Sequence, residues 1–118
     1  MTVLLIDDND DQRSTLADAL RERGWRVETA RSGRIGLDVA SRSQPSIVLT
    51  ELILPDVRGF HYADALRGMV SHEMLVIALT RVSEQLHERA RKAGFDYVQP
   101  KPVDVDELHQ RMRSMLPA

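Results

Sequence analysis

Cysteine is absent from this chain of 118 residues. Disulfide bonds, thiolate metal sites and cysteine nucleophiles are therefore excluded together. Aromatic residues make up only 4% of the sequence, so the core has to be built from aliphatic side chains and methionine. Cores of that kind suit helices packed on a parallel sheet.

Long hydrophobic runs and an excess of charge of one sign are also missing. The longest apolar run, Met74 to Leu79, is far too short to cross a bilayer. Asp7 and Asp8 interrupt the first apolar run too early for a signal segment. A formal net charge of -2 gives no bulk attraction to nucleic acid or to anionic membranes. We therefore expect a soluble, cytoplasmic protein that binds neither of them.

Short apolar runs alternate with longer amphipathic stretches, and this alternation is the main architectural signal. The apolar runs predict strands at Thr2–Ile6, Trp25–Ala30, Ser46–Leu49, Met74–Leu79 and Asp96–Gln99. Apolar residues at helical spacing predict helices at Asp10–Arg23, Ser32–Ser41, Phe60–Met69, Ser83–Ala93 and Asp104–Met115. This order predicts one α/β domain over residues 1–118, with a doubly wound, five-stranded parallel sheet covered by helices on both faces.

Glycine, proline and capping residues stand where these elements are expected to begin and end. They are Gly24 and Gly94 as helix stops, Ser32 and Asp104 as helix caps, Pro55, Asp56 and Gly59 in a loop, and Pro117 after the last helix. Their positions agree with the periodicity of the apolar residues, which supports the predicted order of elements.

Polar side chains follow the apolar runs at the ends of four predicted strands. They are Asp7 and Asp8, Thr50 and Glu51, Thr80 and Arg81, and Lys101 between two prolines. In a doubly wound sheet, ligands bind beyond the carboxyl ends of the strands, so these side chains are expected to converge. Crowded carboxylates are costly without a cation, and a hard ion such as Mg²⁺ prefers oxygen ligands. A nearby hydroxyl and ammonium suit a phosphoryl group.

Each of these residues also has an ordinary structural explanation. Asp8 or Asp10 is a candidate N-cap for the first helix. Thr80 is suited to starting a turn, and Lys101 to a solvated loop. The structural explanation is weaker for the set than for any single residue, because all of them fall at the same end of the predicted sheet.

Four segments together resemble the receiver domain of response regulators in two-component and phosphorelay signalling. They are the acidic pair Asp7-Asp8, the segment IVLTELILPDVRGF from Ile47 to Phe60, Thr80 after MLVIAL, and AGFDYVQPKPVDVDEL from Ala93 to Leu108. The resemblance covers essentially the whole chain, with the segments in family order and spacing. It implies the flavodoxin-like receiver sandwich that the element order also predicts.

The resemblance implies a role for each matching position. It implies Asp7 and Asp8 as Mg²⁺ ligands, together with the main-chain carbonyl of Ile53. It implies Thr80 as the hydroxyl that senses a phosphoryl group and Lys101 as the lysine that pairs with the phosphoacceptor.

The chain departs from the family pattern at three positions. Glu51 stands at the phosphoacceptor position, where it would also be a metal ligand, and the family has aspartate there. Arg81 follows Thr80 where receivers commonly carry a small residue. Val98 falls at the switch position that is often aromatic, while Tyr97 is one place early and is expected on the other face of its strand.

These departures predict a pseudo-receiver that acts as a phosphorylation-independent interaction module, with Mg²⁺ binding weakened or lost because of Glu51. Two states fit: Glu51 holds the domain in an active-like state, or it only disables the site. An ion pair between Arg81 and Glu51 is a further hypothesis. The alternatives are a receiver still phosphorylated in a Mg²⁺-dependent phosphorelay and a phosphatase of the haloacid-dehalogenase type.

The expected partners are proteins: a sensor histidine kinase, a fused output domain or a downstream regulator. The surface formed by the last two helices and the last strand, including Arg89, Arg113 and Gln110, is a candidate interface. We expect no enzymatic activity from the domain itself, and a monomer or weak homodimer.

Overall fold

The computed structural model describes residues 1–57 and 60–116, so the expectations for Gly59 and Pro117 fall outside the described residues. The strands are β1 (Thr2–Ile6), β2 (Arg26–Ala30), β3 (Ile47–Glu51), β4 (Leu75–Thr80) and β5 (Tyr97–Pro100). The helices are α1 (Asp10–Glu22), α2 (Gly33–Ser43), α3 (Tyr62–Arg67), α4 (Glu84–Lys92) and α5 (Val105–Met115). Strands and helices alternate along the chain, as predicted.

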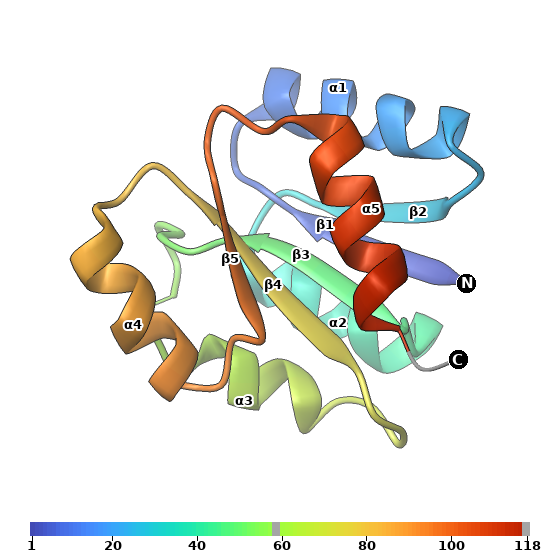
Figure 1. Ribbon diagram of the computed structural model, residues 1–118. Coiled ribbons are helices and arrows are strands. Elements are labelled where there is room, and N and C mark those ends of the chain that lie inside the picture. Colours follow the sequence, from blue (N-terminus) through green and yellow to red (C-terminus); the bar gives the residue numbers. More distant parts are fainter. Residues whose placement is uncertain (58–59, 117–118) are drawn as a thin grey trace.

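The strands form one parallel sheet in the order β2-β1-β3-β4-β5 (Figure 1). Helices α1 and α5 cover one face of the sheet, and α2, α3 and α4 cover the other. This is the flavodoxin-like order, in which the chain switches direction between β1 and β3. The predicted fold class is confirmed.

Two aliphatic cores lie on the two faces of the sheet. Leu5, Leu49 and Leu79 point from the strands towards α1 and α5, while Val48 and Ala78 point towards the other helices. Alternation along each strand produces this division, because successive side chains face opposite sides. The central strands are buried on both faces, which explains their continuous apolar sequences.

Side-chain caps fix where three of the helices begin. Ser32 Oγ accepts a hydrogen bond from the Ile35 N–H, and Asp104 Oδ1 accepts one from the Glu107 N–H, as predicted. At α1 the cap is Asn9, whose side chain accepts the Gln12 N–H at 2.9 Å. The prediction of Asp8 or Asp10 as this cap was wrong, and the difference leaves Asp7 and Asp8 outside the helix.

Glycines in the left-handed region end two helices. Gly24, after α1, has φ of 93°, and Gly94, after α4, has φ of 105°. An L side chain is strained in this backbone conformation, so both positions suit glycine, as expected from sequence.

Several boundaries differ from the prediction by one to two residues. Strand β3 extends to Glu51 and β4 to Thr80, because the parallel ladder continues through the pair Glu51–Leu79. The predicted strands ended at Leu49 and Leu79, before the first polar residue. Ladder hydrogen bonds do not depend on side-chain polarity, so Thr50, Glu51 and Thr80, which were expected after the strands, belong to them.

Helix α3 is shorter than the predicted range Phe60–Met69. It begins after His61, which makes no side-chain cap, and ends at Gly68, whose N–H bonds to the Asp64 carbonyl. Other shifts are small: α2 continues to Ser43, and β2 and β5 begin one residue later than predicted.

The loop after β3 is tied to the beginning of α2. The Asp56 carboxylate accepts hydrogen bonds from the Gly33 and Arg34 N–H groups, both at 2.9 Å. The Tyr62 hydroxyl donates to the Gly33 carbonyl at 2.7 Å. Partial burial acts to raise the pKa of the Asp56 carboxyl, but the two N–H donors outweigh it and lower the pKa below its usual range. The loop that follows Glu51 is therefore anchored at a helix N-terminus.

Among residues 1–57 and 60–116, none of the helices has the length and apolar character needed to cross a membrane.

We expect Asp56→Ala to lower the free energy of unfolding by about 1 kcal/mol at neutral pH, as for loss of an exposed helix cap. Because the folded pKa of Asp56 is depressed, its contribution is present above the unfolded pKa and is lost as the pH falls. Urea unfolding of both proteins from pH 7 to pH 3 measures the difference. Asp38→Ala, on the exposed side of α2, is the control and should change little. A difference that grows on acidification contradicts the assignment.

We expect Gln99→Leu to raise the free energy of unfolding by about 1 to 2 kcal/mol, because a buried acceptor without a donor is costly. Gln99 is 2% exposed, and its Oε1 has no hydrogen-bond partner among the described residues. Gln44→Leu is the matched control, since the Gln44 amide bonds to Ser41, Met69 and Ser71 and its loss should destabilise. Urea unfolding measures both; destabilisation by Gln99→Leu contradicts the prediction.

Candidate functional site

Polar side chains from four elements meet at the carboxyl edge of the sheet. Asp7 follows β1, Glu51 ends β3, Thr80 ends β4 and Lys101 follows β5. The edge lies where the strand order reverses, between β1 and β3. Parallel strands bring these four residues together although they are far apart in the sequence.

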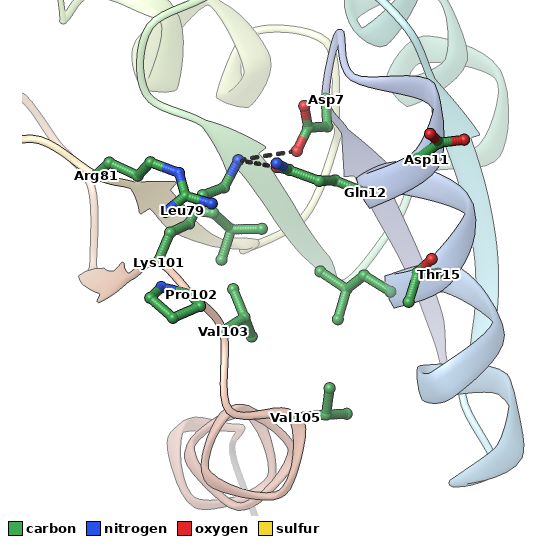
Figure 2. A pocket seen from close by; sticks show the side chains of 11 residues that line it. Asp7, Asp11, Gln12, Thr15, Leu79, Arg81, Lys101, Pro102, Val103 and Val105 are labelled. Atoms are coloured by element: carbon green, nitrogen blue, oxygen red, sulfur yellow. Dashed lines mark hydrogen bonds and ion pairs between the residues drawn. The ribbon is translucent and has the colours of Figure 1, made fainter.

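The Lys101 ammonium connects the two carboxylates of this group, and Figure 2 shows its contacts with Asp7 and Gln12. Its Nζ lies 3.1 Å from Asp7 Oδ2, 3.5 Å from Glu51 Oε1 and 2.9 Å from Gln12 Oε1. The lysine side chain is only 7% exposed. Lys101 is therefore a buried, paired cation, and its interpretation as a solvated loop residue was wrong.

Both carboxylate oxygens and the main-chain oxygen of Asp7 accept hydrogen bonds. Its Oδ1 accepts the Asn9 N–H at 2.9 Å, while its Oδ2 binds Lys101. The Arg13 guanidinium donates to the main-chain oxygen of Asp7 at 2.8 Å. With 3% of its surface exposed, Asp7 is a fixed negative charge inside the site.

The Glu51 carboxylate is half-buried and also fully engaged. Its Oε1 faces Lys101, and its Oε2 accepts the Leu52 N–H at 3.0 Å. Burial raises the pKa of Glu51 above its usual range, and the nearby Asp7 charge acts in the same direction. Lys101 and the Leu52 N–H favour the charged form but do not outweigh burial.

Thr80 is buried beside this group, but its hydroxyl faces its own loop. The Thr80 Oγ1 accepts the Val82 N–H at 3.2 Å, and the side chain is 1% exposed. In the described ranges, no hydrogen bond connects Thr80 with Glu51. The expectation that Thr80 starts a turn agrees with this geometry, while its role towards a phosphoryl group stays a prediction.

Residues 97 and 98 face opposite sides of β5, as predicted. Val98 packs in the core beneath α2, α3 and α4. Tyr97 packs on the face covered by α1 and α5, where the Arg111 guanidinium lies 4.4 Å from its ring centre. The small Val98 side chain therefore occupies the predicted switch position, and the tyrosine ring is on the other side of the sheet.

Asp8 and Arg81, which were expected near the site, are exposed, and Arg81 lines a cavity together with Asp7 and Lys101. The Ile53 side chain is 58% exposed, and the role of its main-chain carbonyl as a metal ligand stays a prediction. In the part of the chain that the structure describes, Arg81 makes no ion pair with Glu51, so that hypothesis was wrong. Lys101 pairs with Glu51 instead, and its ammonium reaches Glu51 from the segment after β5, which is separated from β3 by β4.

The arrangement does not fit a magnesium ion. Within residues 1–57 and 60–116, no group of three or more Asp, Glu or His side chains is placed to hold a metal. All four carboxylate oxygens of Asp7 and Glu51 already have partners, and the ammonium of Lys101 lies between the two groups. A cation of the protein itself occupies the place that the crowded carboxylates were expected to offer to Mg²⁺.

Sequence reasoning missed Gln12, whose side chain is a direct partner of Lys101. Gln12 is three residues after the cap Asn9, in the first turn of α1. The available signal was its distance from the cap, because the first turn of the helix after β1 lies beside the carboxyl edge. Strand ends alone do not include helix residues of this kind, so this partner of Lys101 was not predicted.

Comparisons with known proteins identify the family of the chain. The family described as response regulator receiver domain matches residues 3–113. The probable transcriptional regulatory protein TcrX of Mycobacterium tuberculosis is 30% identical over 119 residues, covering 98% of this chain and 50% of TcrX. The regulatory protein AtoC of Escherichia coli is 35% identical over 111 residues, covering 91% of this chain and 23% of AtoC. The chain thus spans half or less of the length of these relatives.

Solved structures agree in fold. A response regulator receiver domain protein from Clostridium thermocellum superposes with a TM-score of 0.86 at 25% identity, covering 96% of this chain and 91% of that one. The chemotaxis response regulator CheY4 of Vibrio cholerae has a TM-score of 0.86 at 24% identity, with 98% of each chain covered. The haloacid-dehalogenase alternative gains no support from these matches. The chain belongs to the response regulator receiver domain family.

Proposed function

We propose that this chain is a receiver whose signalling state does not depend on phosphorylation, with Glu51 at the phosphoacceptor position. The observation that carries the proposal is the Lys101 ammonium shared by Asp7 and Glu51, at 3.1 Å and 3.5 Å. This contact gives the edge of the sheet its own counter-ion. The domain then has no electrostatic need for an external cation.

Because the three charged groups are buried, disruption of their contact is expected to be costly. The side chains of Lys101, Asp7 and Glu51 are 7%, 5% and 17% exposed. Removing one partner from a buried ion pair leaves an uncompensated charge, which costs much more than the pair itself contributes. Each of the three side chains therefore depends on the others for its charge compensation, which favours the paired arrangement.

The position of the Glu51 carboxylate also opposes phosphotransfer. Glutamate is one methylene longer than aspartate, so its oxygens reach farther from the strand. One oxygen faces Lys101, and the other accepts the Leu52 N–H. A nucleophile has to be aligned with the phosphorus atom and the leaving group, and small displacements lower the rate strongly. Both oxygens are therefore held by contacts within the protein, and these contacts do not align either oxygen for attack on a phosphorus atom.

The Thr80 hydroxyl supports the disabled scaffold over the active-like state. An active-like state needs the Glu51 charge to engage Thr80 as a phosphoryl group would. Here the Thr80 oxygen accepts the Val82 N–H, and Glu51 is satisfied by Lys101 and Leu52. We therefore propose that Glu51 disables the phosphorylation-dependent switch, so that the domain keeps one conformation and presents one constant surface to its partners.

The proposed role is a cytoplasmic protein-interaction module without enzymatic activity of its own. Its partners would be a sensor histidine kinase, a fused output domain or a downstream regulator. The exposed side of α4 supports such a surface, because it carries Arg91 in an exposed pair with Glu88, and Arg89 lies 5.3 Å from the Phe60 ring centre. A receiver that still accepts phosphate is the competing proposal, and the following experiment separates the two.

We expect wild type to remain unmodified, and Glu51→Asp to gain a phosphoryl group, when each is incubated with Mg²⁺ and a small-molecule phosphodonor. The shorter aspartate withdraws from Lys101 and frees an oxygen for transfer. Intact-mass measurement reads the result directly.

The matched controls are Glu51→Gln, which has the length of glutamate but no charge, and Glu28→Asp, the same chemical change at an exposed position of β2. Both should stay unmodified. Modification of wild type contradicts the proposal. If Glu51→Asp is unmodified too, Glu51 is not what removes phosphotransfer, and that claim is also wrong.

We expect wild type to lose stability relative to Glu51→Gln as the pH rises from about 4 to 7. The folded pKa of Glu51 is raised, so the folded state binds this proton more tightly than the unfolded state does. That contribution is present at low pH and is lost as the pH rises through the folded pKa. Urea unfolding followed by the single tryptophan, Trp25, measures it. A constant difference, or one of opposite slope, contradicts the assignment.

A further inference from the structure

A cavity of about 290 Å³ lies between α1, the end of β4 and the segment from Lys101 to Val105 (Figure 2). Its base is aliphatic, and Leu16, Leu79, Val103 and Val105 line it. The volume is at the lower end of the range for ligand pockets, roughly 300 Å³ and above. An apolar base of this size suits a small ligand or a short aliphatic chain.

The charges around the cavity are of two kinds. Asp7 and Lys101 are paired with each other, so they offer little to a ligand. Arg81 is exposed and has no ion-pair partner among residues 1–57 and 60–116. Asp11 lies at the opposite edge in Figure 2 and belongs to the first turn of α1, where the helix N-terminus favours its charge. The charges left for a ligand are therefore the Arg81 guanidinium at one edge and the Asp11 carboxylate at the other, so an anionic group is favoured at the Arg81 edge.

We propose that this cavity binds a small aliphatic carboxylate, with its carboxylate on Arg81 and its chain between α1 and α5. A guanidinium presents a planar pair of donors that matches a carboxylate. The aliphatic walls remove the chain from water, which is favourable in proportion to the apolar area buried. A cation would meet Arg81 as a like charge, and a purely polar anion would leave the apolar base unused.

Such a ligand would lie directly beside the buried ion pairs of the candidate site. Lys101 and Asp7 contribute to both the cavity wall and the shared ammonium contact. Gln12, which accepts from Lys101 at 2.9 Å, lines the cavity as well. A ligand in the cavity would therefore change the surroundings of Lys101 without any phosphoryl group. The proposal concerns binding alone, so it stands or falls independently of whether Glu51 accepts phosphate.

The probe is sodium octanoate, titrated into the ¹⁵N-labelled full chain without phosphodonor and followed by amide chemical shifts. We expect saturable shifts at Leu16, Val103 and Val105, and much weaker binding of octylammonium and of acetate. These two ions separate the contribution of the charge from that of the chain.

Arg81→Gln should raise the octanoate Kd about tenfold, as expected for loss of a charged hydrogen-bond partner. Arg34→Gln, which removes an exposed arginine at the other side of the molecule on α2, is the matched control and should leave Kd unchanged. Thr15→Trp places a ring over the cavity from an exposed position on α1 and should abolish binding while the protein remains folded.

The absence of saturable shifts in wild type overturns the proposal. So does an equal Kd for Arg81→Gln and Arg34→Gln, or octylammonium binding as tightly as octanoate. Far-UV circular dichroism and urea unfolding of each variant show that a loss of binding does not reflect a loss of fold.

Discussion

The ammonium of Lys101, buried between the carboxylates of Asp7 and Glu51, is the interaction on which the site depends. One positive charge within 3.5 Å of two negative charges compensates most of the repulsion that crowded carboxylates create. It also engages one oxygen of the Glu51 carboxylate, while the other accepts the Leu52 N–H. The behaviour proposed for this receiver rests on that one contact.

The fold makes this contact possible through its parallel sheet. Strands β1 and β3 are neighbours at the switch point, and Ile6 pairs with Thr50. Asp7 and Glu51 are the next residues in sequence after this pair, so they lie side by side. The segments around them are fixed by local bonds, since Asn9 caps α1 and Asp56 ties the following loop to α2. These anchors are hydrogen bonds of loop residues and lie outside the two hydrophobic cores.

The order of elements was predictable because apolar periodicity and strand ends are local properties of the sequence. The convergence of Asp7, Glu51 and Lys101 followed from the parallel topology. Pairing did not follow, since Arg81 and Lys101 both approach the edge and only three-dimensional distances decide which cation reaches Glu51. Gln12 was missed for the same reason: its contact is made across 89 residues of sequence. The cavity depends on how α1 and α5 are spaced, which no local pattern specifies.

We propose that Lys101 takes the place of a divalent cation at this edge of the sheet. A calorimetric Mg²⁺ titration compares wild type with Lys101→Met, which keeps the length of the side chain without its charge. We expect no saturable binding to wild type at millimolar Mg²⁺, and binding to Lys101→Met, where the two carboxylates lose their internal counter-ion. Saturable binding to wild type with Lys101 in place would contradict it.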